Sequence, residues 1–438
     1  MRTLVPNPSS GAPRFSKQRR PFLEPIAYPK EYPHFEKPPL TNNVNLTLPL
    51  RAVLPEDADR AEAEGRLVFH LSGDTGSIHG DNSQVAIAEA MEQQVKSATD
   101  AKRPAFLYNL GDVVYFNGQS ELYPSQFYEP YQYYPSPIFA IAGNHDGDTR
   151  VRPGDEPDTE PSLYGFMENF CSVQARHISP YRPTMTQPYV YWTLQAPLIT
   201  IIGLYSNVEG TLDARGTYEQ HRWLEDQLHT AAKSDCFIVV AVHHPPYSLD
   251  RTHGGSPDIA AALDEAMRTT GVKPHAVVSG HVHDYQRFTR ALDGRQIPYI
   301  VDGRGGYAND ARLVHKLQKG DNGDPPEKGA QTPSEQDREL DLKIEGYDQA
   351  NPGFLRATVT RVELTIESFS MPFDGRFDDR PQDAVAVTRD GRLAGNGSRG
   401  AGTPRLAAVG AAEAFVSPED GPARRPPPSR ARPAALLG

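Results

Sequence analysis

Five short motifs, each placed directly after an apolar run, constrain this chain more than any other feature of its sequence. Side chains that follow the strands of an open α/β sheet gather at the carboxyl edge of that sheet, so separated segments can meet in one crevice. The pattern therefore predicts an α/β fold with one site built from all five segments. The motifs are Gly73-Asp74-Thr75-Gly76, Gly111-Asp112-Val113-Val114-Tyr115, Gly143-Asn144-His145-Asp146, Val240-Ala241-Val242-His243 and Gly280-His281-Val282-His283.

The side chains of these motifs are of metal-binding types: carboxylates, a phenol, an amide and imidazoles, without a thiolate. Such oxygen and nitrogen ligands suit iron, manganese or zinc, and two ions about 3.5–4 Å apart can hold a phosphate group and activate a water. His281 and His283 are two residues apart, which puts both on one face of an extended segment. Asn144 can bind a metal through its amide oxygen while His145 beside it stays free as a proton donor. The donors thus predict a two-metal site for a phosphate ester.

Each ligand residue also has an ordinary structural interpretation when it is taken alone. Asp74 and Asp112 are of the type that forms turns, and Tyr115 is of the type that packs in a core. A carboxylate at the position of Asp112 can instead bridge two cations. His243 and His244 are adjacent on an extended segment, so only one of them faces the site easily. The shared position after strands favours the metal site over these separate roles.

The composition limits the classes of partner. The chain has 438 residues, 38% of them hydrophobic, which allows a sizeable core, and its formal net charge is -11. A chain this acidic is a poor non-specific binder of nucleic acid or of an anionic membrane. We therefore expect a small phosphorylated substrate, no nucleic-acid partner and no membrane contact, while the oligomeric state stays open.

Two features bear on the cellular compartment. The two cysteines, Cys171 and Cys236, are too few for a disulfide framework or a zinc finger. The N-terminus lacks the apolar stretch of a secretory signal, and no apolar run is long enough to span a bilayer. A cytoplasmic enzyme is the expectation.

Changes in composition divide the chain into three parts. Residues 1–60 form a proline-rich N-terminal extension. Residues 61–375 alternate short apolar runs with amphipathic stretches, which is typical of an α/β catalytic domain. Residues 376–438 are rich in Arg, Gly, Ala and Pro, so we expect a low-complexity, disordered tail without packed contacts. Two insertions, at about 147–188 and 308–349, interrupt the domain.

Apolar periodicity predicts the main elements of the domain. The predicted strands are Arg66–Ser72, Ala105–Leu110, Pro137–Ala142, Tyr189–Leu194, Leu198–Gly203, Cys236–Val242, Ala276–Ser279, Pro298–Val301, Phe354–Val359 and Glu363–Phe369. The predicted helices are Ser83–Ala98, Thr217–Lys233 and Pro257–Thr269. In the second helix, Thr217-x-x-Gln220 predicts a capping box.

Two other stretches favour structural roles. The tyrosine-rich segment Leu122–Pro137 is expected to be a structural cover more often than a lining of the cleft. Gly303-Arg304-Gly305-Gly306-Tyr307 is expected to form a tight turn, with an anion site at Arg304 as the alternative.

Taken together, the motifs resemble those of the calcineurin-like metallophosphoesterase superfamily. Within it, the combination GDxG, GDxxY, GNH, VxxH and GHxH is similar to that of the purple acid phosphatases. Gly76 stands where many superfamily relatives carry a histidine, and Tyr115 stands where many carry a carboxylate. These departures agree, because a phenolate replaces the missing ligand. The resemblance implies an αββα sandwich of two mixed β-sheets flanked by helices.

The resemblance also implies a role for each site residue. Iron(III) would be held by Asp74, Asp112, Tyr115 and His283. A divalent iron, manganese or zinc ion would be held by Asp112, Asn144, His243 and His281. Asp112 would bridge the two ions, and His145 would protonate the leaving oxygen. His244 and His253 are weaker catalytic candidates, since His253 merely lies a few residues after the ligand His243.

Hydrolysis of a phosphate monoester by attack of a metal-bound hydroxide is the leading interpretation of this set. A phosphodiesterase acting on a nucleotide or a phospholipid-type substrate is the alternative, and the two insertions decide between them by shaping the cleft. A non-catalytic binding protein on the same fold is the remaining possibility. Such a protein is expected to have lost some ligands, whereas this chain carries all seven.

Overall fold

The structure is a computed structural model that describes residues 45–148, 160–207, 211–213, 217–319, 323–331, 340–373 and 376–394. Its strands are β1 (Thr47–Pro49), β2 (Arg66–Ser72), β3 (Leu107–Asn109), β4 (Ile138–Ala140), β5 (Trp192–Gln195), β6 (Ile199–Leu204), β7 (Phe237–Val242), β8 (Ala276–Ser279), β9 (Tyr285–Leu292), β10 (Arg295–Asp302), β11 (Ala330–Gln331), β12 (Leu342–Asp348), β13 (Gly353–Thr360), β14 (Glu363–Ser370) and β15 (Asp383–Thr388). Its α-helices are α1 (Leu50–Val53), α2 (Pro55–Glu64), α3 (Asn82–Ser97), α4 (Asn144–Gly147), α5 (Tyr164–Phe170), α6 (Glu219–Ala231) and α7 (Pro257–Thr270).

Two mixed β-sheets form the centre of the described chain. One sheet has the order β15-β14-β13-β2-β3-β4, and the other has the order β1-β5-β6-β7-β8-β10-β9-β12-β11. Strands β2, β3 and β4 are parallel to one another, as are β6, β7 and β8. Their carboxyl ends therefore lie along one edge of each sheet, and the motifs come directly after these strand ends.

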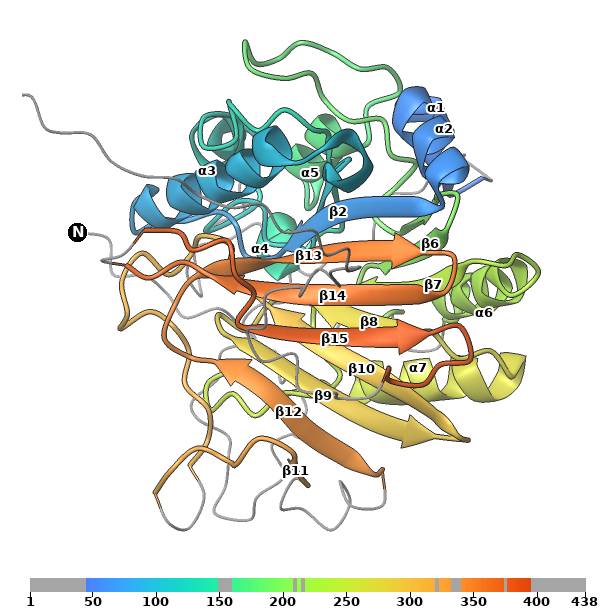
Figure 1. Ribbon diagram of the computed structural model, residues 1–438. Coiled ribbons are helices and arrows are strands. Elements are labelled where there is room, and N and C mark those ends of the chain that lie inside the picture. The colour runs from blue at the N-terminus through green and yellow to red at the C-terminus, as the bar shows by residue number, and fades with distance from the viewer. Residues whose placement is uncertain are drawn as a thin grey trace, which may run out of the picture. The chain divides into compact units, whose positions relative to one another are not determined.

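Alternating side chains in the strands explain how the layers pack. In β7, Phe237, Val239 and Ala241 join the core between the sheets, while Ile238, Val240 and Val242 face the helices α6 and α7. Helix α3 packs on the outer face of the other sheet through residues such as Ile87 and Met91. Figure 1 shows this order, with α3 on one side and α6 and α7 on the other. The αββα sandwich of two mixed sheets is thus confirmed.

The C-terminal boundary of the domain differs from the expectation. The strand β15 pairs antiparallel with β14, with Glu363 opposite Thr388. Val385 and Val387 of this strand are buried. The prediction that everything after residue 375 is a disordered tail is therefore wrong for 383–388, since alternating apolar residues there complete the sheet. Residues 395–438 and 1–44 lie outside the described residues.

The N-terminal boundary and one helix cap also differ. Elements β1, α1 and most of α2 precede residue 61, so the domain starts within the expected extension. Helix α6 has no capping box. Instead, the Asp213 carboxylate accepts the backbone N–H groups of Gln220 at 2.9 Å and His221 at 3.0 Å. The Gln220 side chain instead accepts the backbone N–H of Tyr205, directly after β6, and donates to the Tyr205 carbonyl.

Neither a membrane helix nor a disulfide is seen in the described chain. None of its helices combines the length and apolarity needed to cross a bilayer. Cys171 and Cys236 are both free thiols.

Candidate metal centre

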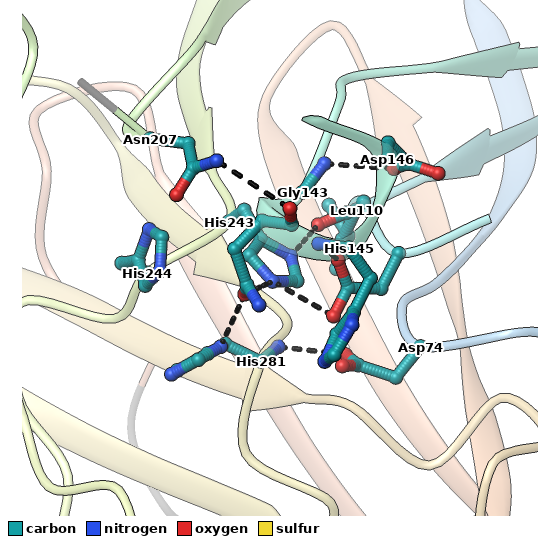
Figure 2. Close-up of polar contacts among 12 residues, drawn as sticks. Asp74, Leu110, Gly143, His145, Asp146, Asn207, His243, His244 and His281 are labelled. Atoms are coloured by element: carbon teal, nitrogen blue, oxygen red, sulfur yellow. Dashed lines mark hydrogen bonds and ion pairs between the residues drawn. The ribbon is translucent and has the colours of Figure 1, made fainter. Parts of the chain in front are cut away.

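Backbone hydrogen bonds fasten the motif-bearing strand ends to each other. Asp74 donates its N–H to the carbonyl of Gly111 at 2.9 Å, which joins the ends of β2 and β3. Gly280 donates to the carbonyl of His243 at 3.1 Å, which joins the ends of β7 and β8. The side chains of all five motifs consequently meet at the shared edge of the two sheets, as Figure 2 shows for four of the motifs.

Three residues of the centre have backbone conformations that L-residues rarely adopt. The φ angles of Asp74, Asp112 and His281 are 56°, 53° and 71°. A non-glycine residue in this left-handed region costs on the order of 1–3 kcal/mol, and surrounding structure must hold it there. All three side chains are fully buried in the centre, so this strain accompanies their inward placement.

Gly76 lies where the surrounding backbone leaves no room for a side chain. A Cβ on Gly76 would lie 2.6 Å from the Val113 carbonyl oxygen and 2.8 Å from Gln126 Oε1. A side chain cannot be placed there without moving backbone. The histidine that many superfamily relatives carry at this position is thus excluded by this backbone. The space beside it is occupied by the segment that leads to Tyr115.

One side of the centre, here called the acidic half, consists of Asp74, Tyr115 and His283 beside the shared Asp112. The Tyr115 hydroxyl lies 2.9 Å from Asp74 Oδ1, 3.0 Å from Asp112 Oδ2 and 3.4 Å from His283 Nε2. His283 Nε2 is also 3.3 Å from Asp74 Oδ1. All four residues are at most 5% exposed.

The other side, here called the histidine half, consists of Asn144, His243 and His281 beside the same Asp112. His243 Nδ1 lies 2.9 Å from the Leu110 carbonyl and donates to it. Its Nε2 faces Asn144 Oδ1 at 3.1 Å and Asp112 Oδ2 at 3.4 Å. Asn144 Oδ1 is also 3.0 Å from His281 Nδ1. The seven predicted ligands therefore come together as two groups joined by Asp112.

The donor atoms in both halves suit cations. With the His243 proton on Nδ1, Nε2 presents a lone pair toward two oxygens that also present lone pairs. Such a cluster is unfavourable unless a proton or a cation lies between its members. Ligand atoms that each lie about 2.1 Å from one ion are roughly 3.0–3.4 Å apart, which is the spacing seen here.

Burial and neighbouring charges together raise the pKa values of Asp74 and His243 and lower that of Asp112. Burial, together with Asp112, raises the pKa of Asp74 to about 7 despite the nearby His243. Burial opposes ionisation of Asp112, yet His243 and His145 hold the pKa of Asp112 below its usual range. Burial alone would lower the pKa of His243, but Asp112 and Asp74 raise it to about 9. The cluster thus attracts positive charge.

His145 is held beside the candidate metal ligands without joining either half. Its backbone N–H donates to Asp112 Oδ1 at 2.8 Å, and its Nδ1 donates to the Phe116 carbonyl at 2.6 Å. The ring packs 4.4 Å from the rings of Tyr115 and Phe116. Burial lowers the pKa of His145, although Asp112 opposes this shift. With Nδ1 occupied, Nε2 is the atom left for chemistry.

His244 and His253 are near the centre but differ in their surroundings. His244 Nδ1 is 2.8 Å from Ser206 Oγ, and its ring lies 4.4 Å from that of His281. The His253 ring also lies 4.4 Å from that of His281, and it is 5.9 Å from that of His283. Both residues therefore line the histidine half, and His244 also offers a ring nitrogen within 4.8 Å of ligand atoms of His243 and His281, which makes it a further candidate metal ligand there.

Three residues to which the sequence analysis assigned no role at the site support the centre, and of these Asp146 and Tyr307 lie in stretches named above. Asp146 accepts the backbone N–H groups of Val113 at 3.0 Å and Gly143 at 2.8 Å, which ties two motif loops together. The Tyr307 ring packs 4.2 Å from His283, and the His315 ring packs 4.4 Å from it. Asp146 is the last residue of a motif, so its position was a usable signal. Nothing local marks His315.

The two stretches with expected structural roles contribute to packing. Four tyrosines of the segment 122–137 are buried in the core outside the six-stranded sheet, namely Tyr123, Tyr128, Tyr131 and Tyr134. The Arg304 side chain pairs with Asp302 at 2.8 Å and with Asp348 at 3.3 Å. Arg304 is 1% exposed and is therefore committed to these carboxylates, which removes the alternative of an anion site.

Comparison with known proteins shows relatives among the phosphoesterases. The calcineurin-like phosphoesterase family matches residues 68–285. Purple acid phosphatase 22 of Arabidopsis thaliana is 27% identical over 172 residues, which cover 37% of this chain and 38% of that protein. Tartrate-resistant acid phosphatase type 5 of Homo sapiens is 24% identical over 275 residues, which cover 59% of this chain and 78% of that protein. The match thus spans less than half of the plant protein.

A solved structure with a similar chain is that of GAP50, the anchor in the inner membrane complex of Plasmodium. It is 16% identical in sequence, and the superposition has a TM-score of 0.47. The matched region covers 70% of this chain and 84% of that chain.

Proposed function

Because this chain belongs to the calcineurin-like metallophosphoesterase superfamily and is similar to the purple acid phosphatases, we propose that it hydrolyses phosphate monoesters at a two-metal site. The acidic half would hold iron(III), and the histidine half would hold a divalent iron, manganese or zinc ion. The substrate would be a small phosphorylated molecule.

The observation that supports this proposal is the convergence of lone-pair donors on both sides of Asp112. Asp112 Oδ2 is 3.0 Å from the Tyr115 hydroxyl and 3.4 Å from His243 Nε2, so one carboxylate reaches both groups of ligands. A non-catalytic binding protein would not require a buried cluster of donor atoms on a strained backbone. The same geometry suits monoesters and diesters alike.

The bound cations would neutralise the charge of the phosphate and activate a water for in-line attack. The chain itself supplies the remaining steps. The Asp112 carboxylate contacts both halves and so holds them next to each other. The hydrogen bond from His145 Nδ1 to the Phe116 carbonyl fixes the orientation of the His145 ring. The protonated ring then carries a hydrogen on Nε2, which it gives to the leaving oxygen.

The test is metal analysis of the purified chain combined with two assays, on p-nitrophenyl phosphate and on bis(p-nitrophenyl) phosphate. We expect two metals per chain, and faster hydrolysis of the monoester, lost on chelation and restored by iron with zinc or manganese. Preference for the diester would instead identify a phosphodiesterase. Bound metal without hydrolysis of either compound would favour a binding protein.

A further inference from the structure

The backbone N–H of His283 has no partner in a β-sheet. His283 lies between the end of β8 at Ser279 and the start of β9 at Tyr285. Its N–H donates instead to the Nδ1 atom of His315 at 3.2 Å, and the N–H of His315 donates to the His283 carbonyl at 3.0 Å. The two residues, 32 positions apart, thus hold each other by a reciprocal pair of hydrogen bonds.

His315 belongs to the second insertion, and the residues that follow it in that segment pair through their backbone with residues 249–251. Arg251 donates its N–H to the Lys316 carbonyl at 3.1 Å, and Gln318 donates to the Leu249 carbonyl at 2.9 Å. The His315 side chain is 13% exposed. Its position is therefore set by backbone pairing, so it does not depend on the His283 contact alone.

The ring of His315 packs against the inner wall of the site. Its centroid is 4.4 Å from that of His283 and 4.6 Å from that of His253. Asp250 Oδ2 lies 3.4 Å from His315 Nδ1 and already accepts the N–H groups of Thr252 and His253. The ring is thus confined between two histidines and a buried carboxylate.

Two groups compete for Nδ1 of His315. A backbone N–H always carries its hydrogen, so the 3.2 Å contact with His283 uses the Nδ1 lone pair, whereas Asp250 Oδ2 at 3.4 Å would accept a proton from the same atom; the His283 contact is the shorter of the two. This contact fixes the His283 backbone at a point where no strand does. The His283 ring extends from that backbone to place Nε2 3.3 Å from Asp74 Oδ1.

We propose that His315 is a positioning residue of the metal centre, whose Nδ1 lone pair holds His283 in place for the cation of the acidic half. The inference rests on the proposed two-metal function. It adds a residue from the second insertion that acts on one half of the centre and leaves the other half alone. Partners of this kind that orient a metal ligand typically change metal affinity by roughly 10–100-fold.

Two substitutions separate the accepting atom from the ring. In His315→Asn, the Oδ1 atom is joined to the backbone through the same number of bonds as Nδ1, so it keeps the acceptor and loses the ring. In His315→Phe, the ring is kept and the acceptor is lost. Any effect of packing alone would be worse in the Asn variant, and any effect of the acceptor would be worse in the Phe variant.

His275 provides a matched control far from the metal ligands. Its Nδ1 accepts the backbone N–H of Ile238 at 3.0 Å, and its Nε2 donates to the Arg389 carbonyl at 3.1 Å. His275→Asn and His275→Phe therefore repeat the same exchange of acceptor and ring at the opposite end of β7. They should change the melting temperature without changing the metal content.

The experiment measures metal stoichiometry, chelator-dependent release of each metal, the visible spectrum and the melting temperature of the metal-free protein. We expect His315→Phe to lose the acidic-half cation roughly 10–100-fold more readily, together with the visible charge-transfer band that a Tyr115 phenolate on iron(III) would give, while release of the divalent ion is unchanged. His315→Asn should behave nearly like the wild type. The metal-free melting temperature reports whether each variant folds.

Other outcomes would overturn the assignment. Equal losses in both His315 variants, a larger loss in the Asn variant or no loss in either would each show that the accepting atom does not position His283. Equal weakening of both metals would also contradict a role confined to the acidic half. A wild-type chain that binds no metal would instead refute the proposed two-metal function, so the two failures are distinguishable.

Discussion

The acidic half and the histidine half of the centre share Asp112 but offer different charge. The acidic half adds the Asp74 carboxylate and the Tyr115 phenol to one imidazole, whereas the histidine half adds one amide to two imidazoles. Because anionic oxygen ligands gain more from a cation of higher charge, the proposed two-metal function would place a trivalent ion in the acidic half and a divalent one in the histidine half. The different donors of the two halves would thus give one small site two different preferences for the charge of the cation.

Asp112→Ala should have the largest effect, since it removes the only side chain common to both halves. We expect both metals to be lost and turnover to fall by more than roughly 100-fold, the upper cost of changing a residue that merely supports a ligand. Metal analysis and p-nitrophenyl phosphate hydrolysis measure the two effects. A variant with two metals and normal turnover would show that Asp112 bridges nothing.

His145→Ala tests a residue that belongs to neither half. It should keep both metals while turnover on an alkyl phosphate falls by roughly 10²–10⁴-fold, the usual contribution of a positioned acid. The loss should shrink on an aryl phosphate, because a good leaving group needs less protonation. Equal losses on both substrates would indicate phosphate binding by His145, and loss of metal would place it among the ligands.

Tyr115→Phe should affect the acidic half alone. The phenol oxygen is removed while the ring remains, so we expect at least roughly 10-fold weaker binding of the acidic-half cation and loss of the visible band. The divalent ion of the histidine half should stay. Tyr307→Phe is the matched control, because its ring packs 4.5 Å from that of Tyr115 within the same centre. Loss of colour in both variants would contradict the phenolate assignment.

Asp146→Ala should lower the stability of the protein more than it changes catalysis, because Asp146 ties together two of the motif loops. It leaves buried N–H groups of Val113 and Gly143 without their acceptor. The free energy of unfolding should fall by about 2–3 kcal/mol, measured by denaturant titration. Asp146→Asn keeps one accepting oxygen and should lose less. If neither variant changes this free energy, the loops are held by other contacts.

Much of the fold was predictable because its signals are local. The strands β2 and β8 have the predicted bounds, since each is an apolar run that ends at a polar motif. The strand β15 was missed because alternation in Ala384–Val387 is short and lies beside a low-complexity stretch. The strand is ordered by its pairing with β14, and nothing within residues 383–388 indicates that pairing.

The residue types at the strand ends, and hence the two sets of candidate metal donors, follow from the sequence alone. Each motif is short and directly follows its strand, so residue type and local periodicity place the ligands at one edge. Only the tertiary structure decided which residues support them. His315 reaches His283 because Arg251 and Lys316 pair their backbones, a contact between distant segments that leaves no periodic trace in a polar insertion.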